Sequence, residues 1–205
     1  DHNNTNFLLD QNQDGEIQMS EASLVKRMVF FQRSNYTTLE GINSFVNLET
    51  ILYENDGSSS HIHGKIDDIN IDGLNNFKTF NLSGCDIGKI SIKNCPNLIE
   101  IKSAYTDTYN ASNFNVHGNT QEMTIDNCAQ LQKILWTNNN LGNANITNSP
   151  SLIHLELRGN SMSAFDASQL VNLEDLDLSN NQQTWGPISG EANFGPTLSS
   201  MYING

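Results

Sequence analysis

A triplet of apolar residues, spaced apolar-x-x-apolar-x-apolar, recurs eight times along this 205-residue chain. Successive triplets start 23, 29, 21, 33, 21, 21 and 25 residues apart, a period typical of chains that wind into stacked coils. A single coil cannot bury its own apolar side chains, so the repeat predicts one core shared by neighbouring coils. The triplets begin at Val25, Leu48, Phe77, Leu98, Leu131, Leu152, Leu173 and Leu198.

The last two apolar residues of each triplet flank one outward residue, as in a β-strand with one buried face. In the copy that starts at Leu152, we expect Leu155 and Leu157 to point inward and Glu156 to point out. A 21-residue coil is too short for a full helix on its return side, so we expect extended or 3₁₀ segments and mild curvature. Apolar pairs recur there at Ile69 and Ile71, Ile90 and Ile92, Met123 and Ile125, and Ala144 and Ile146.

The ninth position of each copy is predicted to close the turn that follows the strand. A side-chain amide suits this position because it can bond backbone groups that the turn leaves unpaired. The column reads Arg33, Asp56, Cys85, Thr106, Asn139, Asn160 and Asn181. We therefore expect an asparagine ladder in the C-terminal half.

The longer intervals predict insertions near residues 57–64, 107–119 and 182–194. Insertions in solenoids often shape a binding site, although drift in a tolerant surface turn explains any single one equally well. Tyr105, Tyr109 and Trp185 flank or enter the second and third insertions. Such aromatic residues could anchor a protein, stack on sugar rings or simply pack their own loops.

Ahead of the triplets, residues 10–21 read DQNQDGEIQMSE and match the EF-hand calcium loop at every diagnostic position. Gly15 permits the sharp turn, Ile17 is expected to pack inward, and an exiting helix is expected over residues 22–28. Calcium prefers hard oxygen ligands, and the alternative is an acidic turn that caps the coils without metal. The predicted Ca²⁺ ligands are Asp10, Asn12, Asp14, Glu16 (through its carbonyl), Gln18 (through water) and Glu21.

The formal net charge of −13 argues against nucleic acid and anionic lipid as partners, and no apolar run is long enough to span a membrane. The start at Asp1, without Met or a signal peptide, favours a processed, secreted product. Three cysteines make no complete disulfide framework. Cys95 and Cys128 should be neighbours on adjacent coils, where they could form a bridge or remain buried free thiols.

This loop, joined directly to short L-x-x-L-x-x-x-x-N repeats, resembles the secreted, internalin-like leucine-rich-repeat proteins of Gram-negative bacteria. The junction comprises residues 14–22 (DGEIQMSEA), followed by LEGI at 39–42 and VNL at 46–48. The resemblance implies an α/β horseshoe-type, right-handed, β-rich solenoid of about eight coils over residues 25–205. A small helical calcium-loop cap would occupy residues 1–24. Two departures are the three insertions and the end at Asn204–Gly205 without a cap or sorting domain, which predicts a truncated chain.

The outward strand positions predict a surface with two features. Val29, Phe31 and Leu52 could form an apolar patch near the N-terminal end. Further along, a mixed-charge stripe suits a protein interface with charge complementarity, although an ordinary solvated sheet face explains it as well. The stripe comprises Lys102, Lys133, His154, Glu156, Arg158, Asp175 and Asp177. Trp136 falls on an inward position and is expected in the core, whereas His61 and His63 are expected to face solvent.

The resemblance implies a secreted or cell-surface protein that binds other macromolecules, and it transfers no catalytic residues. We expect a protein-binding, adhesion-type module whose partner is a host or bacterial surface protein. The alternative is a glycan-binding module that uses Tyr105, Tyr109 or Trp185 for stacking. No enzyme is expected, because the sequence has no G-x-S-x-G, H-E-x-x-H or phosphate-binding glycine-rich motif.

Overall fold

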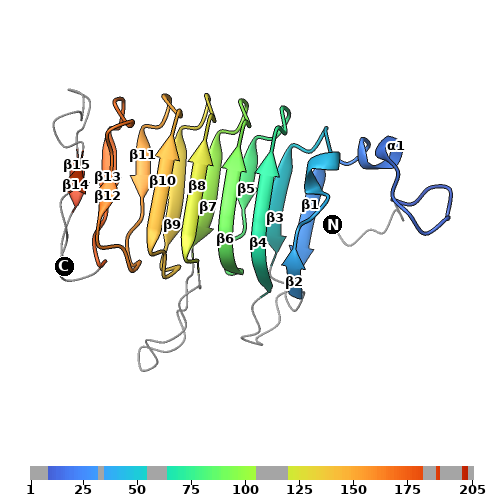
Figure 1. Cartoon of the computed structure of the whole chain (residues 1–205), viewed down its shortest axis with the longest axis horizontal. Helices are drawn as coiled ribbons and strands as arrows, with labels where there is room; N and C mark the ends of the chain where they lie inside the picture. Colours follow the sequence, from blue (N-terminus) through green and yellow to red (C-terminus); the bar gives the residue numbers. More distant parts are fainter. Residues whose placement is uncertain are drawn as a thin grey trace.

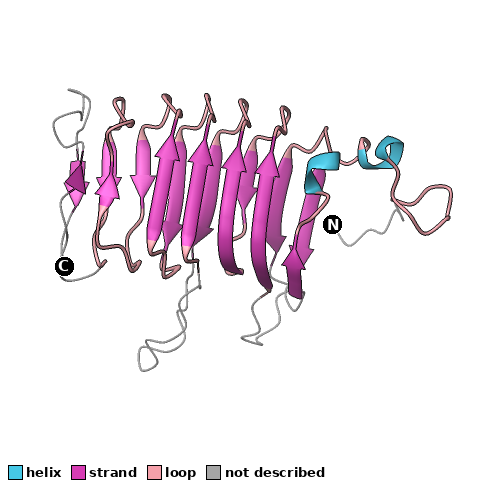
Figure 2. Ribbon diagram, viewed as in Figure 1, coloured by secondary structure: helices cyan, strands magenta, loops and turns pink. Residues whose placement is uncertain are grey.

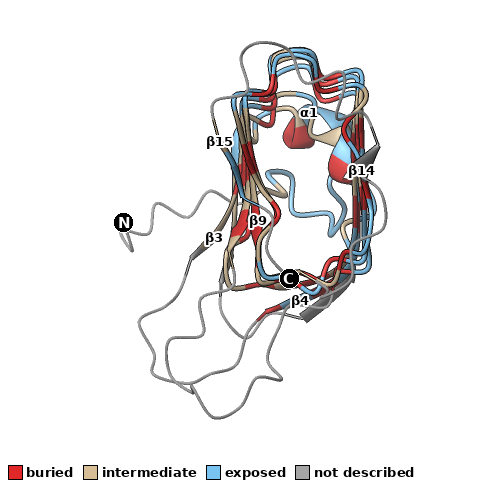
Figure 3. Cartoon of the chain, turned by 90° about the vertical axis from the view of Figure 1, so that its left-hand side faces the viewer, coloured by how far each residue is buried: buried red, intermediate tan, exposed pale blue. Residues whose placement is uncertain are grey.

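The computed structural model describes residues 9–31, 35–54, 64–104, 120–181, 188–189 and 200–202. These residues wind into a parallel β-solenoid in which two sheets face each other (Figures 1 and 2). In Figure 3, which looks along the stack, buried residues lie along both sheets. Within the described segments, helix is limited to α1 (Met19–Ala22) and the 3₁₀ turn η1 (Ile42–Ser44). Neither is long or apolar enough to cross a membrane.

The first sheet holds one strand from each triplet copy, all parallel and in chain order. The predicted strands are confirmed, because inward residues such as Ile51, Ile134 and Leu176 have no exposed surface. The sheet comprises β1 (Arg27–Phe31), β3 (Thr50–Glu54), β5 (Thr79–Asn81), β7 (Glu100–Ala104), β9 (Lys133–Thr137), β11 (His154–Glu156), β13 (Asp175–Asp177) and β15 (Ser200–Tyr202).

The return side of the coils forms further parallel sheet, so of the expected extended or 3₁₀ segments the extended form is confirmed. Ile69, Ile90, Met123 and Ala144 lie next to one another in register and are buried. The five-stranded sheet comprises β2 (Asn35–Thr38), β4 (Lys65–Asp72), β6 (Asp86–Lys93), β8 (Glu122–Asp126) and β10 (Asn143–Thr147). A two-stranded sheet, β12 (Phe165–Asp166) with β14 (Ile188–Ser189), follows at the C-terminal end.

Seen along the stack in Figure 3, the outlines of successive described coils lie almost behind one another, so the expected horseshoe curvature is wrong for these coils. The reason is that strands occupy both sides of each coil. Neighbouring strands are spaced by about 4.8 Å in either sheet, whereas helices on one side would need roughly twice that distance and would bend the stack. The short return segments therefore determine both the β-rich content and the straight axis.

The expected exiting helix over residues 22–28 is also wrong. Helix α1 begins earlier, at Met19, and ends at Ala22 after a single turn. The chain then enters β1 at Arg27, whose backbone pairs with β3 at Thr50. Pairing with a neighbouring strand, and the packing of Val25 and Met28 against the core, outweigh the local helical tendency of this segment.

The core is continuous from coil to coil, as the repeat required. Trp136 is fully buried, as predicted, and its ring stacks on Phe80 with centroids 6.5 Å apart. All three cysteines are free and buried, and burial raises the pKa of the Cys85 and Cys95 thiols to about 12 and that of Cys128 to about 11. These thiols therefore stay protonated at neutral pH and act as small core residues.

Candidate functional site

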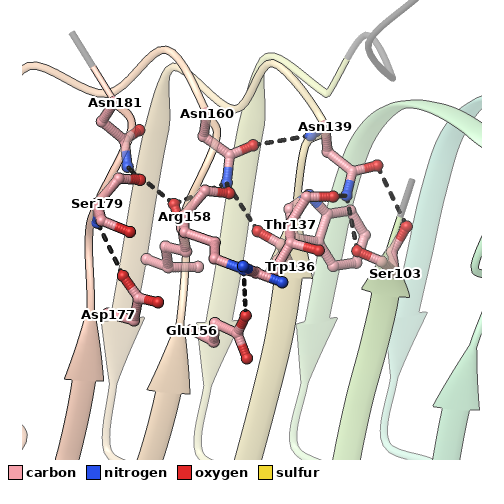
Figure 4. Close-up of polar contacts among 11 residues, drawn as sticks. Ser103, Trp136, Thr137, Asn139, Glu156, Arg158, Asn160, Asp177, Ser179 and Asn181 are labelled. Atoms are coloured by element: carbon pink, nitrogen blue, oxygen red, sulfur yellow. Dashed lines mark hydrogen bonds and ion pairs between the residues drawn. The ribbon is translucent and has the colours of Figure 1, made fainter. Parts of the chain in front are cut away.

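The predicted asparagine ladder lies at one edge of the first sheet and holds the ends of its strands in place (Figure 4). The Asn160 amide donates to the Trp136 and Leu157 carbonyls at 2.7 and 2.9 Å. Its Oδ1 accepts the N–H groups of Asn139 and Leu141, both at 3.0 Å. Asn139 and Asn181 make equivalent bonds in their coils. In the same column, Cys85 donates its thiol to the Gly64 carbonyl.

A second ladder of side-chain amides was missed by the sequence analysis. It uses the residue immediately before each triplet, and most of its amides donate to a backbone carbonyl of the preceding coil. Its members are Asn47, Asn76, Asn97, Gln130 and Asn172. The signal was present in the sequence, because Asn or Gln occupies this position in five of the eight copies. The two ladders together bond successive coils at both ends of the first sheet's strands.

The residues of the predicted mixed-charge stripe share the outer face of this sheet, but most of them are engaged within the chain. His154 lies between Lys133 and Asp175 in register, and its Nδ1 is 3.3 Å from Asp175 Oδ2. Arg158 Nε lies 2.5 Å from Glu156 Oε1 (Figure 4).

Asp177 is also engaged within the chain. Its Oδ1 accepts the Ser179 N–H at 2.9 Å, which holds the turn after β13. Five of the seven stripe residues therefore already have partners inside the molecule.

Lys102 on β7 and Lys133 on β9 are the exceptions. Neither ammonium group forms an ion pair with any residue that the structure describes, although Glu100 is the register neighbour of Lys133. By contrast, four other lysines have a carboxylate oxygen at 2.7–3.6 Å, namely Lys26, Lys65, Lys78 and Lys89. Two uncompensated positive charges thus lie on adjacent strands near the middle of this face.

The other predicted surface elements are described only in part. Val29 and Leu52 are register neighbours on β1 and β3, and both are half-buried. The Phe31 side chain lies outside the described part of the chain, as do Tyr105, Tyr109 and Trp185. Most of the three insertions and the pair His61 and His63 also lie outside it. Their predicted roles therefore stay predictions.

The N-terminal loop is organised by its own carboxylates. Asp10 accepts the Asp14 and Gly15 N–H groups at 3.2 and 2.9 Å, and Gly15 has the positive φ of 85° expected at the turn. Glu21, which is buried, accepts the Gln11 N–H through Oε1 at 2.6 Å and the Gln18 N–H through Oε2 at 3.0 Å. The first and last carboxylates of the motif thus close the loop on itself.

Asp14 lies at the middle of the loop. The Glu16 backbone N–H is the main cause that lowers the pKa of Asp14, and the Asn12 and Gln18 amides add to it. Both amides donate to Asp14 Oδ2, at 2.9 and 2.6 Å. The carboxylate is therefore ionised at neutral pH, and in this arrangement its negative charge is stabilised by hydrogen bonds from N–H groups of the loop.

All six predicted calcium ligands can supply oxygen, which suits calcium chemically. In the described residues, however, no three side chains among His, Cys, Asp and Glu are grouped so that they could hold a metal ion. The predicted donor set differs from such a group, because it also draws on the Asn12 and Gln18 amides and on the Glu16 carbonyl. A cation would compete with the internal hydrogen bonds of Asp14 and Glu21.

The expectation that Ile17 packs inward is wrong. Ile17 is 48% exposed, and its neighbour Met19 is 60% exposed. Figure 1 shows the reason, because α1 and the loop before it extend beyond the N-terminal end of the sheets. A single loop in that position has no second apolar surface to cover its isoleucine.

Comparisons with known proteins leave the family of this chain open. No protein-family model matches the sequence, and no curated protein matches it. Among solved structures, the chain is similar to internalin C2 from Listeria monocytogenes, with 18% sequence identity and a TM-score of 0.40. That alignment covers 91% of this chain and 84% of the internalin chain.

Proposed function

We propose that this protein is a leucine-rich-repeat type of binding module that recognises a protein partner through the outer face of its eight-stranded sheet. The observation that carries the proposal is the pair Lys102 and Lys133, which form no ion pair with any described residue, whereas the other five residues of the mixed-charge stripe contact partners within the chain. A broad sheet of parallel strands held by two amide ladders is a rigid platform, and a rigid surface loses little entropy when it binds.

The charge of the chain favours a partner with exposed carboxylates at this place. A net charge of −13 would repel a uniformly acidic partner, so local attraction has to come from cations on this face that are at least partly exposed, as Lys102 and Lys133 are. Lys102 and Lys133 are available for this purpose, whereas Arg158 and His154 already contact Glu156 and Asp175. Because the attraction is electrostatic, we expect binding to weaken as salt concentration rises.

The test is a screen of the protein against arrays of extracellular proteins and of glycans, followed by affinity measurement on the proteins it captures. The double variant Lys102→Glu, Lys133→Glu is expected to weaken binding at least about tenfold, because it places like charges opposite the partner's carboxylates. Lys89→Glu is the matched control, since Lys89 lies on the five-stranded sheet beside Glu122. Equal loss in both variants would contradict the proposed face.

No described residue favours the glycan-binding alternative, because its aromatic residues lie outside the described chain. Capture on the glycan array that is lost in Trp185→Ala would support that alternative instead. Retention of all protein binding by this variant would then separate the two functions.

We also propose that residues 1–24 form a cap whose loop binds one Ca²⁺ and that the protein is secreted or displayed on the cell surface. The six oxygen donors are Asp10, Asn12, Asp14, the Glu16 carbonyl, Gln18 (through water) and Glu21. Bound calcium would take the place of the amide N–H groups that now hydrogen-bond to the Asp14 carboxylate, and it would rigidify the entry to β1. A single loop of this kind suits the millimolar calcium found outside cells.

Calcium is expected to raise the melting temperature, because a ligand that binds only the folded state stabilises it by about 2.7 kcal/mol at one hundred times its Kd. Circular dichroism melts with calcium and with excess chelator measure this difference. Asp14→Ala should abolish the gain, whereas the control Asp68→Ala, at an exposed position of β4, should keep it. A parent protein that melts at the same temperature in both buffers would contradict calcium binding.

A further inference from the structure

The turns that lead into the strands of the first sheet form one edge of the stack, at the top of Figure 1. In the first three coils, the second residue of each triplet copy lies at this edge and is charged. Lys26 and Lys78 lie 3.6 and 2.7 Å from the carboxylate oxygens of Glu49. Ion pairs between coils therefore line this edge near the N-terminal end.

The same position is uncharged in the next three coils, where it holds Ile99, Gln132 and Ile153. These residues are stacked neighbours, because the Gln132 N–H donates to the Ile99 carbonyl at 3.0 Å and the Ile153 N–H donates to the Gln132 carbonyl at 3.1 Å. Ile99 and Ile153 are 42% and 37% exposed. The edge of these coils contains no Asp, Glu, Lys, Arg or His over residues 95–99, 128–132 and 149–153. The edge thus changes from paired charges to an uncharged, partly apolar surface.

This uncharged edge borders the two lysines on the face of the sheet. Lys133 directly follows Gln132, and Lys102 lies three residues beyond Ile99 on the same coil. With Glu100 included, the outward charges of β7 and β9 sum to +1, on a chain whose net charge is −13. Aliphatic and cationic groups therefore meet at one place, and such a surface is complementary to an acidic residue that has an apolar neighbour.

We propose that the partner protein also contacts this edge and that its binding segment carries an aliphatic side chain next to an acidic one. The acidic side chain would meet Lys102 and Lys133, so this inference rests on the proposed function. The aliphatic side chain would pack over Gln132 and between the two isoleucines, which lie about 10 Å apart because neighbouring strands are spaced by about 4.8 Å. This apolar contact excludes water from the neighbouring ion pairs, and an ion pair is stronger where water is excluded.

Two synthetic twelve-residue peptides test the contact by fluorescence polarisation. Both are built on serine and carry two glutamates, and one of them also carries a leucine beside each glutamate. The parent is expected to bind the leucine-containing peptide at least about tenfold more tightly, because only that peptide fills both parts of the surface. The double variant Ile99→Gln, Ile153→Gln should remove this advantage and leave binding of the other peptide unchanged. Glutamine already occupies the position in the coil between, so the melting temperature should stay close to that of the parent.

Val46→Gln is the matched control, because Val46 is 44% exposed on the same edge but lies in the coil that carries Glu49. It should bind both peptides as the parent does. Equal binding of the two peptides by the parent, with loss of both in Lys102→Glu, Lys133→Glu, would overturn the apolar contact and leave the proposed function intact. A parent that binds neither peptide, or a lysine variant that binds like the parent, would overturn both proposals. A leucine advantage that survives in the isoleucine variant, or that the control also loses, would overturn this inference.

Discussion

Replacing Asn160 with alanine is expected to lower the free energy of unfolding by about 3–5 kcal/mol, because several buried backbone groups lose their partner at once. Its amide donates to the Trp136, Leu157 and Arg158 carbonyls, and its Oδ1 accepts the Asn139 and Leu141 N–H groups. Asn160 as a whole residue is 7% exposed. Water therefore cannot restore most of these bonds without opening the turn between two coils.

Urea unfolding followed by circular dichroism measures this loss. The control is Asn97→Ala, which removes the same side chain from the second amide ladder. Asn97 is half-buried, and its amide donates to the Asn75 carbonyl at 2.7 Å. We expect that control to cost about 1 kcal/mol. If both variants lost the same stability, the ninth-position ladder would have no special role.

Replacing Trp136 with alanine is expected to cost about 3–5 kcal/mol, because the largest fully buried side chain would leave a cavity between coils. Trp136 lies on β9 beside the small Ser103 of β7, and it stacks on Phe80. Its ring therefore fills space that the smaller neighbour leaves open. The coils on either side would lose packing at the same time.

Trp136→Phe separates packing from hydrogen bonding. The indole Nε1 has no hydrogen-bond partner among the described residues, so phenylalanine removes volume without breaking a bond. We expect less than half the loss seen with alanine, measured by the same urea titration. If phenylalanine lost as much stability as alanine, the remaining aromatic ring would contribute nothing. Filling the space with a ring would then not be what stabilises the core.

The repeat could be read from the sequence because the burial of alternate residues in a strand is a local property. Each triplet marks an inward face on its own, and equal spacing places corresponding positions side by side. This is why Ile90 was expected beside Ile69 and why Asn139, Asn160 and Asn181 were expected to close equivalent turns. The calcium loop was found in the same way, from spacing within twelve residues, and its metal remains a prediction.

The partners of individual charges could not be read in this way. Arg158 contacts Glu156 on its own coil, while Lys133, between Glu100 and His154, forms no ion pair with any residue that the structure describes. Side-chain length and rotamer decide such pairings, and all these neighbours are compatible with the same strand register. The exposure of Ile17 was missed for a related reason, because it depends on where the loop extends from the solenoid.

The sequence by itself determined the coil period, the inward face of each strand and the residues that close the turns, since these follow from burial and bonding within one coil. Only the tertiary structure decided the straight axis, the exposure of Ile17 and the absence of a described ion-pair partner for Lys102 and Lys133. The axis and the charge contacts depend on distances between segments that lie tens of residues apart in the chain. The exposure of Ile17 depends on the absence of a packing neighbour beside the loop. Packing of the whole stack sets both.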